Sequence, residues 1–427
     1  MKHGLFFLLA CIVCSCTPKG DTITLVNPLN LEHPDAPVVI ARDQLAEQAA
    51  GLLPLLIDKD GMVIPSQTDD LDGDGQWDEL SFVYSLPANG KAEISLTWAE
   101  EGEMPSFVRR TNIRYGKMTS PGKVEELQSD WLAKENLPRG EGYPFQMDGI
   151  AWENDKVGFR HYFDGRDCRD VFGKRVTDMV LDTVGIKPDG CPGDTYHVLQ
   201  EWGRDILSVA TSFGPGGLAV QKGDSLIRLG VRAGVVNGNV DTARFHIISE
   251  GPVRSLFNLE HIGWDVDGEK VNVQQTVTIW AGSYAYENKM TTSPLPAGCA
   301  MVTGLVRNNN HQPLVEKTWQ NQHRGMVGMV THDKQSYNKE YYMGLALLLP
   351  EEQVVELYDI PEKGKGIDYT WCVRMKPDSQ GEYNYKVYGT WELNDPRFAD
   401  RAYFLGLIDQ DGDRMINPVQ VAVNIRK

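Results

Sequence analysis

Hydrophobic and polar residues alternate at a period of two along much of the chain, a pattern typical of β-strands that bury one face. Residues 271–279 follow this alternation over most of their length, and residues 93–98 repeat it. Further strands are predicted at residues 22–26, 37–41, 80–84, 150–153, 157–163, 244–248 and 383–388. Turn signals such as Ala88-Asn89-Gly90 separate these segments. The pattern therefore predicts an all-β protein.

The order of these segments predicts two β units with few helices. Helical periodicity is limited to residues 44–53 and, as a second candidate, residues 124–135. The stretch at residues 99–106 is acidic, contains glycine and proline and follows a predicted strand, so we place a boundary there. Residues 22–98 are expected to form a small β-sandwich, and residues 107–427 one large β domain.

The first residues have the organisation of an export signal. An apolar run at residues 4–13 is too short to span a membrane. It ends in Val13-Cys14-Ser15-Cys16, where a small residue before a cysteine resembles a bacterial lipobox. This predicts a signal peptide at residues 1–16, a lipid-modified Cys16 and a lipid-anchored protein of the cell envelope, in contact with membrane only through the anchor. Cys11 fits a lipobox locally but leaves a very short apolar core. An ordinary secretory signal is the alternative, and it also means export.

Charge and cysteine content exclude two further classes of protein. The formal net charge is −17 and no run of Lys and Arg occurs, so the chain lacks the basic clusters that bind nucleic acid. Outside the leader, cysteines occur at Cys168, Cys191, Cys299 and Cys372. They are widely spaced and contain no CxxC pair, which predicts neither a disulfide framework nor a cysteine zinc site. Buried free thiols are expected, and a Cys168–Cys191 bridge stays open.

The stretch from Asp69 to Glu79 places six carboxylates within eleven residues. It contains the pattern D-x-D-x-D-G-x-x-D, formed by Asp70, Asp72, Asp74, Gly75 and Asp78. Calcium takes six to eight oxygen ligands, and alternate side chains of a tight loop can converge on one ion, with a backbone carbonyl from Gln76. Two carboxylates ~4 Å apart repel by roughly 4 kcal/mol at an effective dielectric constant of ~20, which favours a bound cation. The sequence therefore predicts a structural Ca²⁺ site.

Two observations limit this interpretation of the acidic stretch. Ser81 occupies the position of the glutamate that closes an EF-hand, so the loop is not an EF-hand. A solvated turn with its aspartates pointing into water is the alternative to a metal site. The segment Asp409–Asp413 begins with the same spacing, but Arg414 replaces the glycine, and we interpret that segment as a turn.

The first of two central segments mixes charged and aromatic residues densely. The predicted strand at residues 157–163 places Arg160 and Tyr162 on one face and His161 on the other. Charged residues of both signs follow it, namely Asp164, Arg166, Asp167, Arg169, Asp170, Lys174 and Arg175. Such a surface suits a sugar acid, because aromatic rings cover the apolar face of a pyranose and arginine pairs with a carboxylate. A salt-bridged β surface without a site is the plainer alternative.

The second segment brings a histidine close to further polar and aromatic residues. It contains Tyr196, His197, Glu201, Trp202, Arg204 and Asp205 within ten residues. His197 follows a loop rich in glycine and proline, and functional groups are common on such loops. Histidine is also the side chain best placed to exchange a proton near neutral pH. His197 is thus a candidate catalytic residue, with a hydrogen-bonded structural histidine as the alternative.

These segments carry a resemblance to a known family. The run W-E…G-F-R-H-Y-F-D…D-V-F-G-K-R from Trp152 to Arg175, E-W-G-R-D-I-L from Glu201 to Leu207, and Q-T-D-D-L-D-G-D-G-Q-W-D-E-L from Gln67 to Leu80 resemble exported Bacteroidota proteins of unknown function. Members of that family are found with polysaccharide-degradation systems, often those for uronic-acid-containing glycans. The resemblance covers nearly the whole mature chain and implies a large β-supersandwich like that of galactose mutarotases and polysaccharide lyases. It supplies no catalytic motif.

The residue chemistry first suggests β-elimination on uronic-acid-containing oligosaccharides, by a lyase or dehydratase. A cation must neutralise the uronate carboxylate, a base must remove the C5 proton, and an acid must assist the group that leaves C4. Arg160 or Arg166 could supply the cation together with Lys174. The base and acid are His197 and Tyr162, in either order. Asp205 would orient His197 and contact substrate, and Trp202 would bind the sugar ring.

Two other functions stay open. A glycoside hydrolase needs two carboxylates roughly 5–10 Å apart. The candidates for such a pair are Glu153, Asp164, Asp170, Glu201 and Asp205. A glycan-binding lipoprotein without turnover would use Trp202 and Tyr162 as stacking platforms. The sequence does not choose the sugar or the linkage.

Overall fold

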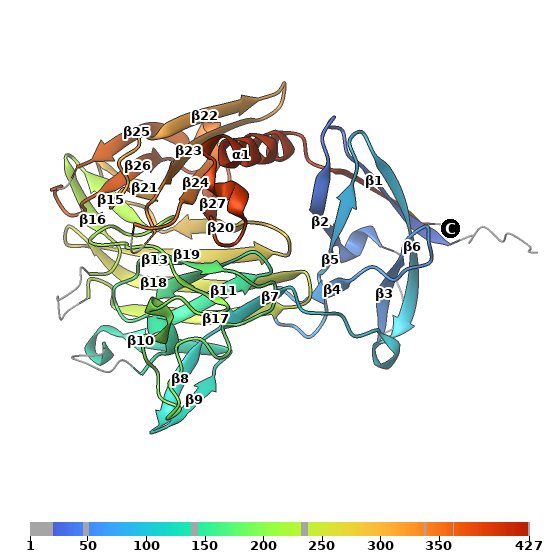
Figure 1. Cartoon of the computed structure of the whole chain (residues 1–427), viewed down its shortest axis with the longest axis horizontal. Helices are drawn as coiled ribbons and strands as arrows, with labels where there is room; N and C mark the ends of the chain where they lie inside the picture. The colour runs from blue at the N-terminus through green and yellow to red at the C-terminus, as the bar shows by residue number, and fades with distance from the viewer. Residues whose placement is uncertain are drawn as a thin grey trace, which may run out of the picture.

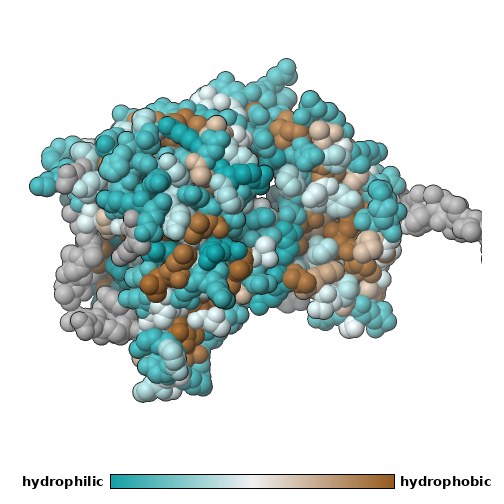
Figure 2. All heavy atoms as spheres, in the orientation of Figure 1, coloured by the Kyte–Doolittle hydropathy of each residue, from teal (hydrophilic) through white to brown (hydrophobic). Residues whose placement is uncertain are grey.

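The computed structural model describes residues 20–45, 51–137, 144–231, 238–336, 339–361 and 363–425. Cys16 and the rest of the leader lie outside the described residues. Within them the chain folds into antiparallel β-sheets, which confirms the predicted all-β sandwich class. Figure 1 shows a small part, built mainly from the first strands in blue, beside a larger part. The face drawn in Figure 2 is mainly hydrophilic, with hydrophobic residues gathered in small patches.

The small part consists of two sheets that enclose their own core. The strand orders are β28-β1-β6-β3 and β2-β5-β4. The bounds are β1 Asp21–Val26, β2 His33–Ala41, β3 Leu52–Ile57, β4 Ser66–Asp69, β5 Glu79–Leu86, β6 Lys91–Glu100 and β28 Gln420–Asn424. Alternate residues such as Ile23, Phe82 and Ile94 are buried between the sheets. β28 pairs with β1, so residues 107–427, which the sequence assigned to the large domain, contribute one strand to the small sheet. The boundary at residues 99–106 stays a prediction.

The large part is organised around a nine-stranded antiparallel sheet in the order β10-β17-β18-β19-β20-β27-β24-β23-β22. The bounds are β10 Ser129–Ala133, β17 Thr242–Glu250, β18 Arg254–Val266, β19 Glu269–Trp280, β20 Ala285–Thr292, β22 Val315–Gln320, β23 Gly325–Asp333, β24 Met343–Pro350 and β27 Glu382–Trp391. In β19, Val273 and Val277 are buried whereas Gln274 between them is exposed. The predicted strand at residues 271–279 is therefore confirmed.

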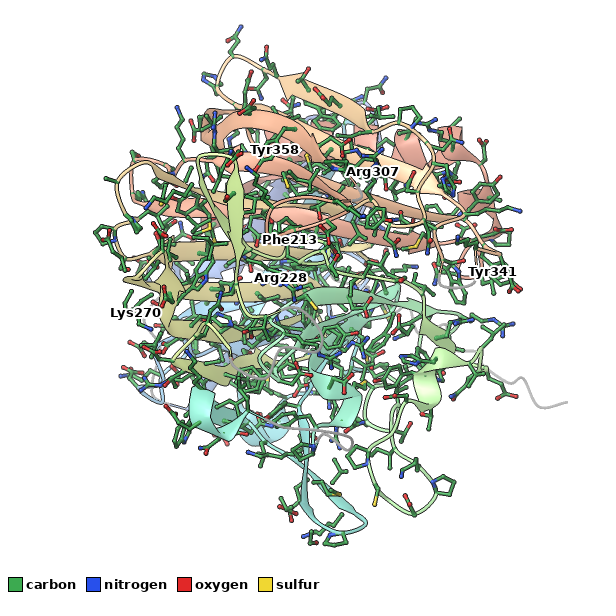
Figure 3. The ribbon with its side chains drawn as sticks, turned by 90° about the vertical axis from the view of Figure 1, so that its left-hand side faces the viewer. Phe213, Arg228, Lys270, Arg307, Tyr341 and Tyr358 are labelled. Atoms are coloured by element: carbon green, nitrogen blue, oxygen red, sulfur yellow. The ribbon has the colours of Figure 1, made fainter. Side chains whose placement is uncertain are left out.

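Two five-stranded sheets share a hydrophobic core with one face of the nine-stranded sheet. Their orders are β14-β13-β12-β11-β7 and β16-β15-β21-β26-β25, and β8 pairs with β9 in a separate hairpin. The bounds are β7 Thr111–Arg114, β8 Gly116–Ser120, β9 Lys123–Glu126, β11 Gly149–Asn154, β12 Val157–Tyr162, β13 Arg169–Lys174, β14 Gly203–Asp205, β15 Ala219–Lys222, β16 Ser225–Arg228, β21 Cys299–Val306, β25 Val354–Ile360 and β26 Thr370–Met375. A smaller apolar cluster containing Phe213, with Tyr358 against it, packs on the second of these sheets (Figure 3).

Helices are few in the part of the chain that the structure describes. The α-helix α1, Arg401–Ile416, packs Phe404 and Ile408 against the face of the nine-stranded sheet opposite the main core (Figure 1). Short 3-10 turns are η1 Arg42–Gln44, η2 Glu101–Glu103, η3 Lys134–Asn136, η4 Gln146–Asp148, η5 Thr195–His197, η6 Glu351–Gln353 and η7 Pro396–Ala399. No helix among the described residues has both the length and the apolar character needed to cross a bilayer.

Three local predictions are wrong. Residues 124–135 form β9 and β10 instead of a helix, because they pair with neighbouring strands. The helix at residues 44–53 is contradicted where the chain is described, since Leu52 and Leu53 begin β3. Asp409–Asp413 lies inside α1 and is not a turn. In that helix Gly412 contacts Trp319 so closely that an added Cβ would lie 2.2 Å from the indole ring. This glycine serves helix packing.

Ion pairs and free thiols complete the framework. Arg254 of β18 pairs with Asp69 and with Glu79, which lies 2.9 Å from the guanidinium, and so joins the large part to the small one. Asp69 is fully buried and its charge is balanced inside the protein. The four cysteines outside the leader are all free, so the Cys168–Cys191 bridge that the sequence left open is not formed.

Candidate active site

The site is built on two neighbouring strands, β12 and β13. Because side chains alternate across a strand, Arg160 and Tyr162 share one face of β12, and Arg160 Nη2 lies 2.5 Å from the Tyr162 hydroxyl. The predicted common face is therefore confirmed. In the antiparallel register Arg160 stands opposite Asp170 of β13. Phe172 of β13 in turn stands opposite Asp205 of β14. The sheet thus brings residues 45 positions apart in sequence to one guanidinium.

Arg160 is fully buried and is held by carboxylates and aromatic rings. Its Nη2 atom lies 2.5 Å from Asp170 Oδ2 and 2.9 Å from Asp205 Oδ2. Its guanidinium carbon lies 4.2 Å from the ring centre of Tyr162 and 5.0 Å from that of Tyr196. A buried cation needs such partners because its desolvation is costly. Arg160 therefore positions the carboxylates and the phenol, and its charge is already balanced inside the protein.

Asp170 and Asp205 contact the same nitrogen of Arg160. Burial, with the Asp205 charge beside it, raises the pKa of Asp170 to about 7. Its Oδ2 atom also lies 3.1 Å from the Tyr162 hydroxyl. Burial raises the pKa of Tyr162 well above its ordinary value. Tyr162 is thus a protonated phenol at neutral pH, and it can donate a hydrogen bond or a proton.

His197 is the solvent-exposed member of this group. Its Nε2 atom lies 3.5 Å from Asp205 Oδ2, and 40 % of its side chain is exposed, against 4 % for Asp205. The side-chain hydrogen bond to Asp205 raises the pKa of His197 above its ordinary value. His197 occupies η5, where its ring meets that of Tyr196 edge to face. A continuous line of contacts thus runs from His197 through Asp205 and Arg160 to Tyr162.

Arg166 lies at the rim of the same group, in the turn after β12. Its guanidinium carbon lies 4.1 Å from the ring centre of Tyr162. It pairs with the buried Asp164 at 2.5 Å and with Asp148 at 3.1 Å. About a quarter of the Arg166 side chain is exposed (26 %), and 18 % of Asp148 is exposed. Arg166 is therefore the cation of this cluster that an incoming anion could reach.

Two of the sequence-predicted residues lie outside the line of contacts. Lys174 is buried against Glu153, with their charged atoms 2.5 Å apart, and it donates to the backbone carbonyls of Asn154 and Asp178. Trp202 donates to Gln200 and meets the ring of Phe172 edge to face, with 6.1 Å between ring centres. Lys174 thus holds a loop, whereas Trp202 borders the cluster through Phe172.

The five carboxylates proposed for a hydrolytic pair are dispersed. Asp170 and Asp205 meet at Arg160. Glu153 pairs with Lys174, Asp164 pairs with Arg166, and Glu201 is exposed. Only the pair of Asp170 and Asp205 brings two of the five candidates to one contact atom among the described residues.

Asp148 is the member of the site that sequence reasoning missed. It accepts a hydrogen bond from the Tyr196 hydroxyl at 3.3 Å and contacts Arg166 at 3.1 Å. Its φ of 59° lies in the left-handed region, which costs energy for a residue with a Cβ. Such strain is a recurrent feature of functional positions. In the sequence, Asp148 was marked only by its position just before the predicted strand at residues 150–153. The local sequence does not indicate that Arg166 contacts it.

The acidic loop brings together part of the predicted calcium ligand set. Oxygens of Asp70, Asp72 and Asp78 lie within 4.8 Å of one another, and Asp74 is not in that group. The carboxylates also accept backbone N–H groups, such as Gly73 and Gly75 donating to Asp70 at 2.8 Å. The side-chain amide oxygen of Gln76 accepts a hydrogen bond from Arg42 at 3.3 Å. The predicted metal ligand at this position is the backbone carbonyl of Gln76. The calcium site stays a prediction.

A family model matches residues 25–421 and carries the description "Domain of unknown function (DUF4861)". The chain belongs to this family. The resemblance to a family of unknown function, inferred from the sequence, is therefore confirmed. This description assigns no activity to DUF4861 members. Inferences about the reaction therefore rest on the geometry of the candidate site.

One curated relative and two solved structures are similar to this DUF4861 chain. "Uncharacterized protein P7" of Formosa agariphila is 24 % identical over 306 residues, which are 66 % of this chain and 68 % of the relative. A glycosyl hydrolase family 38 protein of Enterococcus faecalis has a TM-score of 0.47 at 10 % identity, and an α-mannosidase of the same species has 0.45 at 11 %. The chain is covered at 96 % and 95 %, but it spans only 48 % and 46 % of those two structures. Likenesses this weak carry no conclusion about function.

Proposed function

We propose that this protein acts on uronic-acid-containing oligosaccharides by β-elimination, as a lyase or dehydratase. The reaction removes the C5 proton of a uronate, forms the C4–C5 double bond and expels the substituent of C4. It needs a base on the proton, an acid on the leaving oxygen and a cation on the carboxylate that acidifies C5. The cluster around Arg160 contains one group of each kind.

The contact between His197 and Asp205 is the observation that carries this proposal. An exposed imidazole whose Nε2 faces a buried carboxylate at 3.5 Å is oriented and electrostatically supported for proton transfer. The raised pKa of His197 strengthens it as a base for the C5 proton. We therefore assign the base to His197. We assign the acid to the protonated Tyr162 hydroxyl, as the donor for the leaving oxygen.

Arg166 is the cation that we assign to the uronate carboxylate. It is partly exposed and lies beside the Tyr162 ring. Its partner Asp148 is also partly exposed, so a substrate carboxylate could replace Asp148 at the guanidinium. The charge of Arg160 is balanced by Asp170 and Asp205, and we assign it a positioning role. Lys174 is engaged by Glu153 and has no part in this assignment.

A glycoside hydrolase is the second candidate, and one observation favours it. Asp170 and Asp205 are two close carboxyl groups, and burial raises the pKa of Asp170 to about 7. A carboxyl group whose pKa is raised by burial is the usual general acid of a glycoside hydrolase. Both groups are nearly fully buried, with 1 % and 4 % of their side chains exposed. This burial disfavours a direct attack on a sugar by either carboxylate.

The setting that we propose is the cell envelope, with the protein anchored through lipid on Cys16. This rests on the lipobox and on the described family resemblance. In that setting the partners are oligosaccharides released from polysaccharides. A glycan-binding lipoprotein without turnover is the third possibility, and the product assay below distinguishes it.

The test is a product assay on uronic-acid-containing oligosaccharides. Elimination creates a conjugated double bond, so ultraviolet absorbance should increase with time. New reducing ends without that absorbance would replace the proposal with the hydrolase. Retention on immobilised glycan without any product would identify a binding protein. Absence of both products and binding across uronic-acid glycans would contradict the carbohydrate assignment altogether.

A further inference from the structure

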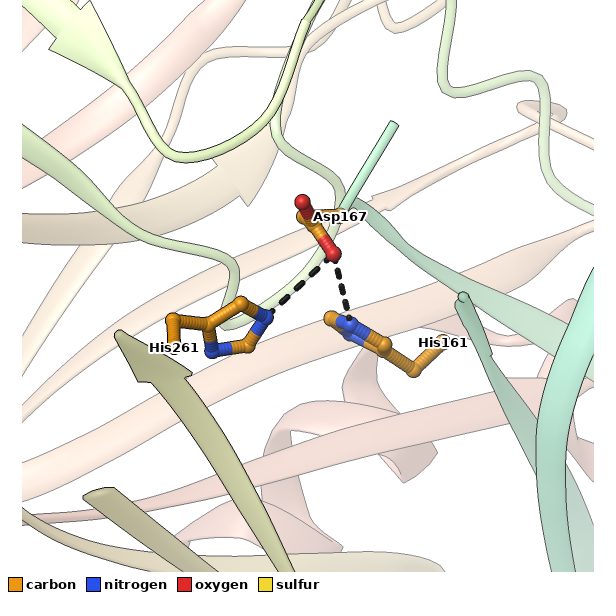
Figure 4. A group of neighbouring side chains, drawn as sticks. All are labelled: His161, Asp167 and His261. Atoms are coloured by element: carbon orange, nitrogen blue, oxygen red, sulfur yellow. Dashed lines mark hydrogen bonds and ion pairs between the residues drawn. The ribbon is translucent and has the colours of Figure 1, made fainter. Parts of the chain in front are cut away.

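A second group of polar side chains lies on the opposite face of β12 from Arg160. Figure 4 shows His161 of β12, Asp167 of the following turn and His261 of β18, all pointing toward one another. His261 comes from the nine-stranded sheet and His161 from the five-stranded sheet that faces it, 100 positions earlier in the sequence. The exposed fractions are 1 %, 3 % and 0 % for His161, Asp167 and His261. The three groups therefore meet in the interior, between two sheets.

The distances from Asp167 to the two histidines are those of neighbouring metal ligands, and all three ligand atoms lie within 4.8 Å of one another. Nε2 of His161 lies 3.4 Å from Asp167 Oδ1, and Nε2 of His261 lies 3.3 Å from the same oxygen. Ordinary N–H···O hydrogen bonds are about 2.7–3.2 Å long, so both separations are long for that interaction. Zinc binds imidazole nitrogen and carboxylate oxygen at about 2.0–2.2 Å, and neighbouring ligands at a tetrahedral angle are then about 3.3–3.4 Å apart.

Only one of the four imidazole nitrogens has a hydrogen-bond partner among the described residues, namely His261 Nε2, which contacts Asp167 Oδ1 at 3.3 Å. Nδ1 of both histidines and Nε2 of His161 have no hydrogen-bond partner among the described residues. Buried polar atoms are almost always partnered, so three orphaned nitrogens in one cluster require an explanation.

We propose that His161, Asp167 and His261 bind one divalent transition-metal ion, with Zn²⁺ as the best match. Two imidazole nitrogens and one carboxylate oxygen form a borderline ligand set that suits zinc better than Ca²⁺ or Mg²⁺, which prefer oxygen. This site is separate from the acidic loop at Asp70, whose ligands are oxygens alone. It does not depend on the proposed function.

The ion would fasten the turn after β12 to the opposite sheet. Asp167 has a φ of 47°, in the left-handed region, and its neighbour Arg166 reaches the candidate active site. Arg228, labelled in Figure 3, fixes the same turn by donating to the Arg166 carbonyl at 2.5 Å. A metal bound by Asp167 would therefore fix the position of the neighbouring Arg166. Its role is structural, since all three ligands are closed off from solvent.

The experiment measures metal content and melting temperature of the full mature protein. Purified protein is stripped with 1,10-phenanthroline, which binds zinc strongly and calcium weakly, and is then titrated with Zn²⁺ alone. We expect about one zinc ion per chain in the untreated protein, a lower melting temperature after stripping and recovery on adding Zn²⁺. The Asp167→Asn and His261→Gln variants should lose the ion and the zinc-dependent shift. His332→Gln, a buried histidine outside the cluster, should keep both.

If the Asp167 or His261 variant fails to fold, the metal content and melting temperature of the wild-type protein still test the proposal. Anomalous diffraction at the zinc edge from crystals of the wild-type protein should place one peak between the three side chains. The proposal is overturned if the wild-type protein purifies without metal, takes up no Zn²⁺ after stripping and melts at the same temperature with and without it. The cluster would then be a carboxylate hydrogen-bonded by two histidines.

Discussion

His197 and Asp205 face each other across 3.5 Å, with the imidazole partly exposed and the carboxylate buried. Asp205 Oδ2 also contacts Arg160, so one carboxylate oxygen connects the exposed histidine to the buried centre of the site. Orientation of a histidine by a buried acid is a common way to hold a base in the correct tautomer. The pairing places His197 at the boundary between solvent and the cluster, where a sugar could reach it.

Replacing Asp205 with Asn should change both stability and pH dependence. Removal of one partner from the buried pair with Arg160 should cost about 3 kcal/mol of unfolding free energy, measured by urea denaturation. His197 acts as a base only when neutral, so activity should rise with pH through its pKa. Because Asp205 raises that pKa, the variant should show a lower maximal rate and a rising limb shifted to lower pH. NMR titration of the His197 ring should show the same decrease.

The matched control for this variant is Glu201→Gln, which removes an exposed carboxylate from the same segment. It should leave the unfolding free energy and the pH profile unchanged. An unchanged His197 pKa in the Asp205 variant would show that the two side chains are not coupled.

Replacing Asp148 with Asn should favour binding of an anionic glycan. Asp148 competes for Arg166 at 3.1 Å, and a substrate carboxylate would no longer have to displace a charge. We expect a several-fold lower KM for a uronic-acid oligosaccharide, corresponding to about 1 kcal/mol. Binding of a neutral oligosaccharide of the same length should not change. The control is Asp60→Asn, at an exposed position of the small part. An unchanged KM in the Asp148→Asn variant would show that Arg166 does not bind the substrate carboxylate.

Replacing Gly412 with Ala should destabilise the protein, although alanine is the better helix former. The added Cβ would overlap Trp319 on β22, and such overpacking costs about 2 kcal/mol. Gly406→Ala in the same helix has no atom within 4 Å of the new Cβ. That control should be stabilising by up to about 1 kcal/mol. Thermal or urea unfolding of the two variants measures the difference, and equal effects would contradict the packing role of Gly412.

Calcium should stabilise the small part if the prediction for the acidic loop is correct. An ion at a hundred times its dissociation constant would add about 2.7 kcal/mol to the unfolding free energy. Calorimetry with and without Ca²⁺ measures this effect. The variant Asp70→Asn should abolish it, because Asp70 belongs to the group of three converging carboxylates. A melting temperature independent of Ca²⁺ would identify the loop as a solvated turn.

The alternation of residues predicted strands well where one face of a sheet is polar. β19 alternates because its outer face carries Gln274 and Thr276 while its inner face lies in the core. β24 is buried on both faces, since α1 covers the outer one, and it reads as a continuous apolar run without a period. α1 itself was missed because its Asp-Gly-Asp sequence is typical of turns, and only the contact with Trp319 explains Gly412.

The candidate site could be predicted only as far as local geometry reaches. A period of two places Arg160 and Tyr162 on one face, and the structure confirms this. Asp170 and Asp205 meet at Arg160 through the pairing of three strands, and strand pairing cannot be read from one sequence. The same limit applies to Lys174, which forms an ion pair with Glu153 of β11, and to His261, which comes from another sheet.

The most direct test of the account compares His197→Ala with His311→Ala in the ultraviolet assay on uronic-acid oligosaccharides. His311 is an exposed histidine outside the cluster, so its removal should leave the rate unchanged. Loss of a general base should decrease the formation of the unsaturated product by about 10²–10⁴-fold at unchanged stability. If the His197 variant forms the product as fast as the wild-type protein does, His197 is not the base and the central claim is wrong.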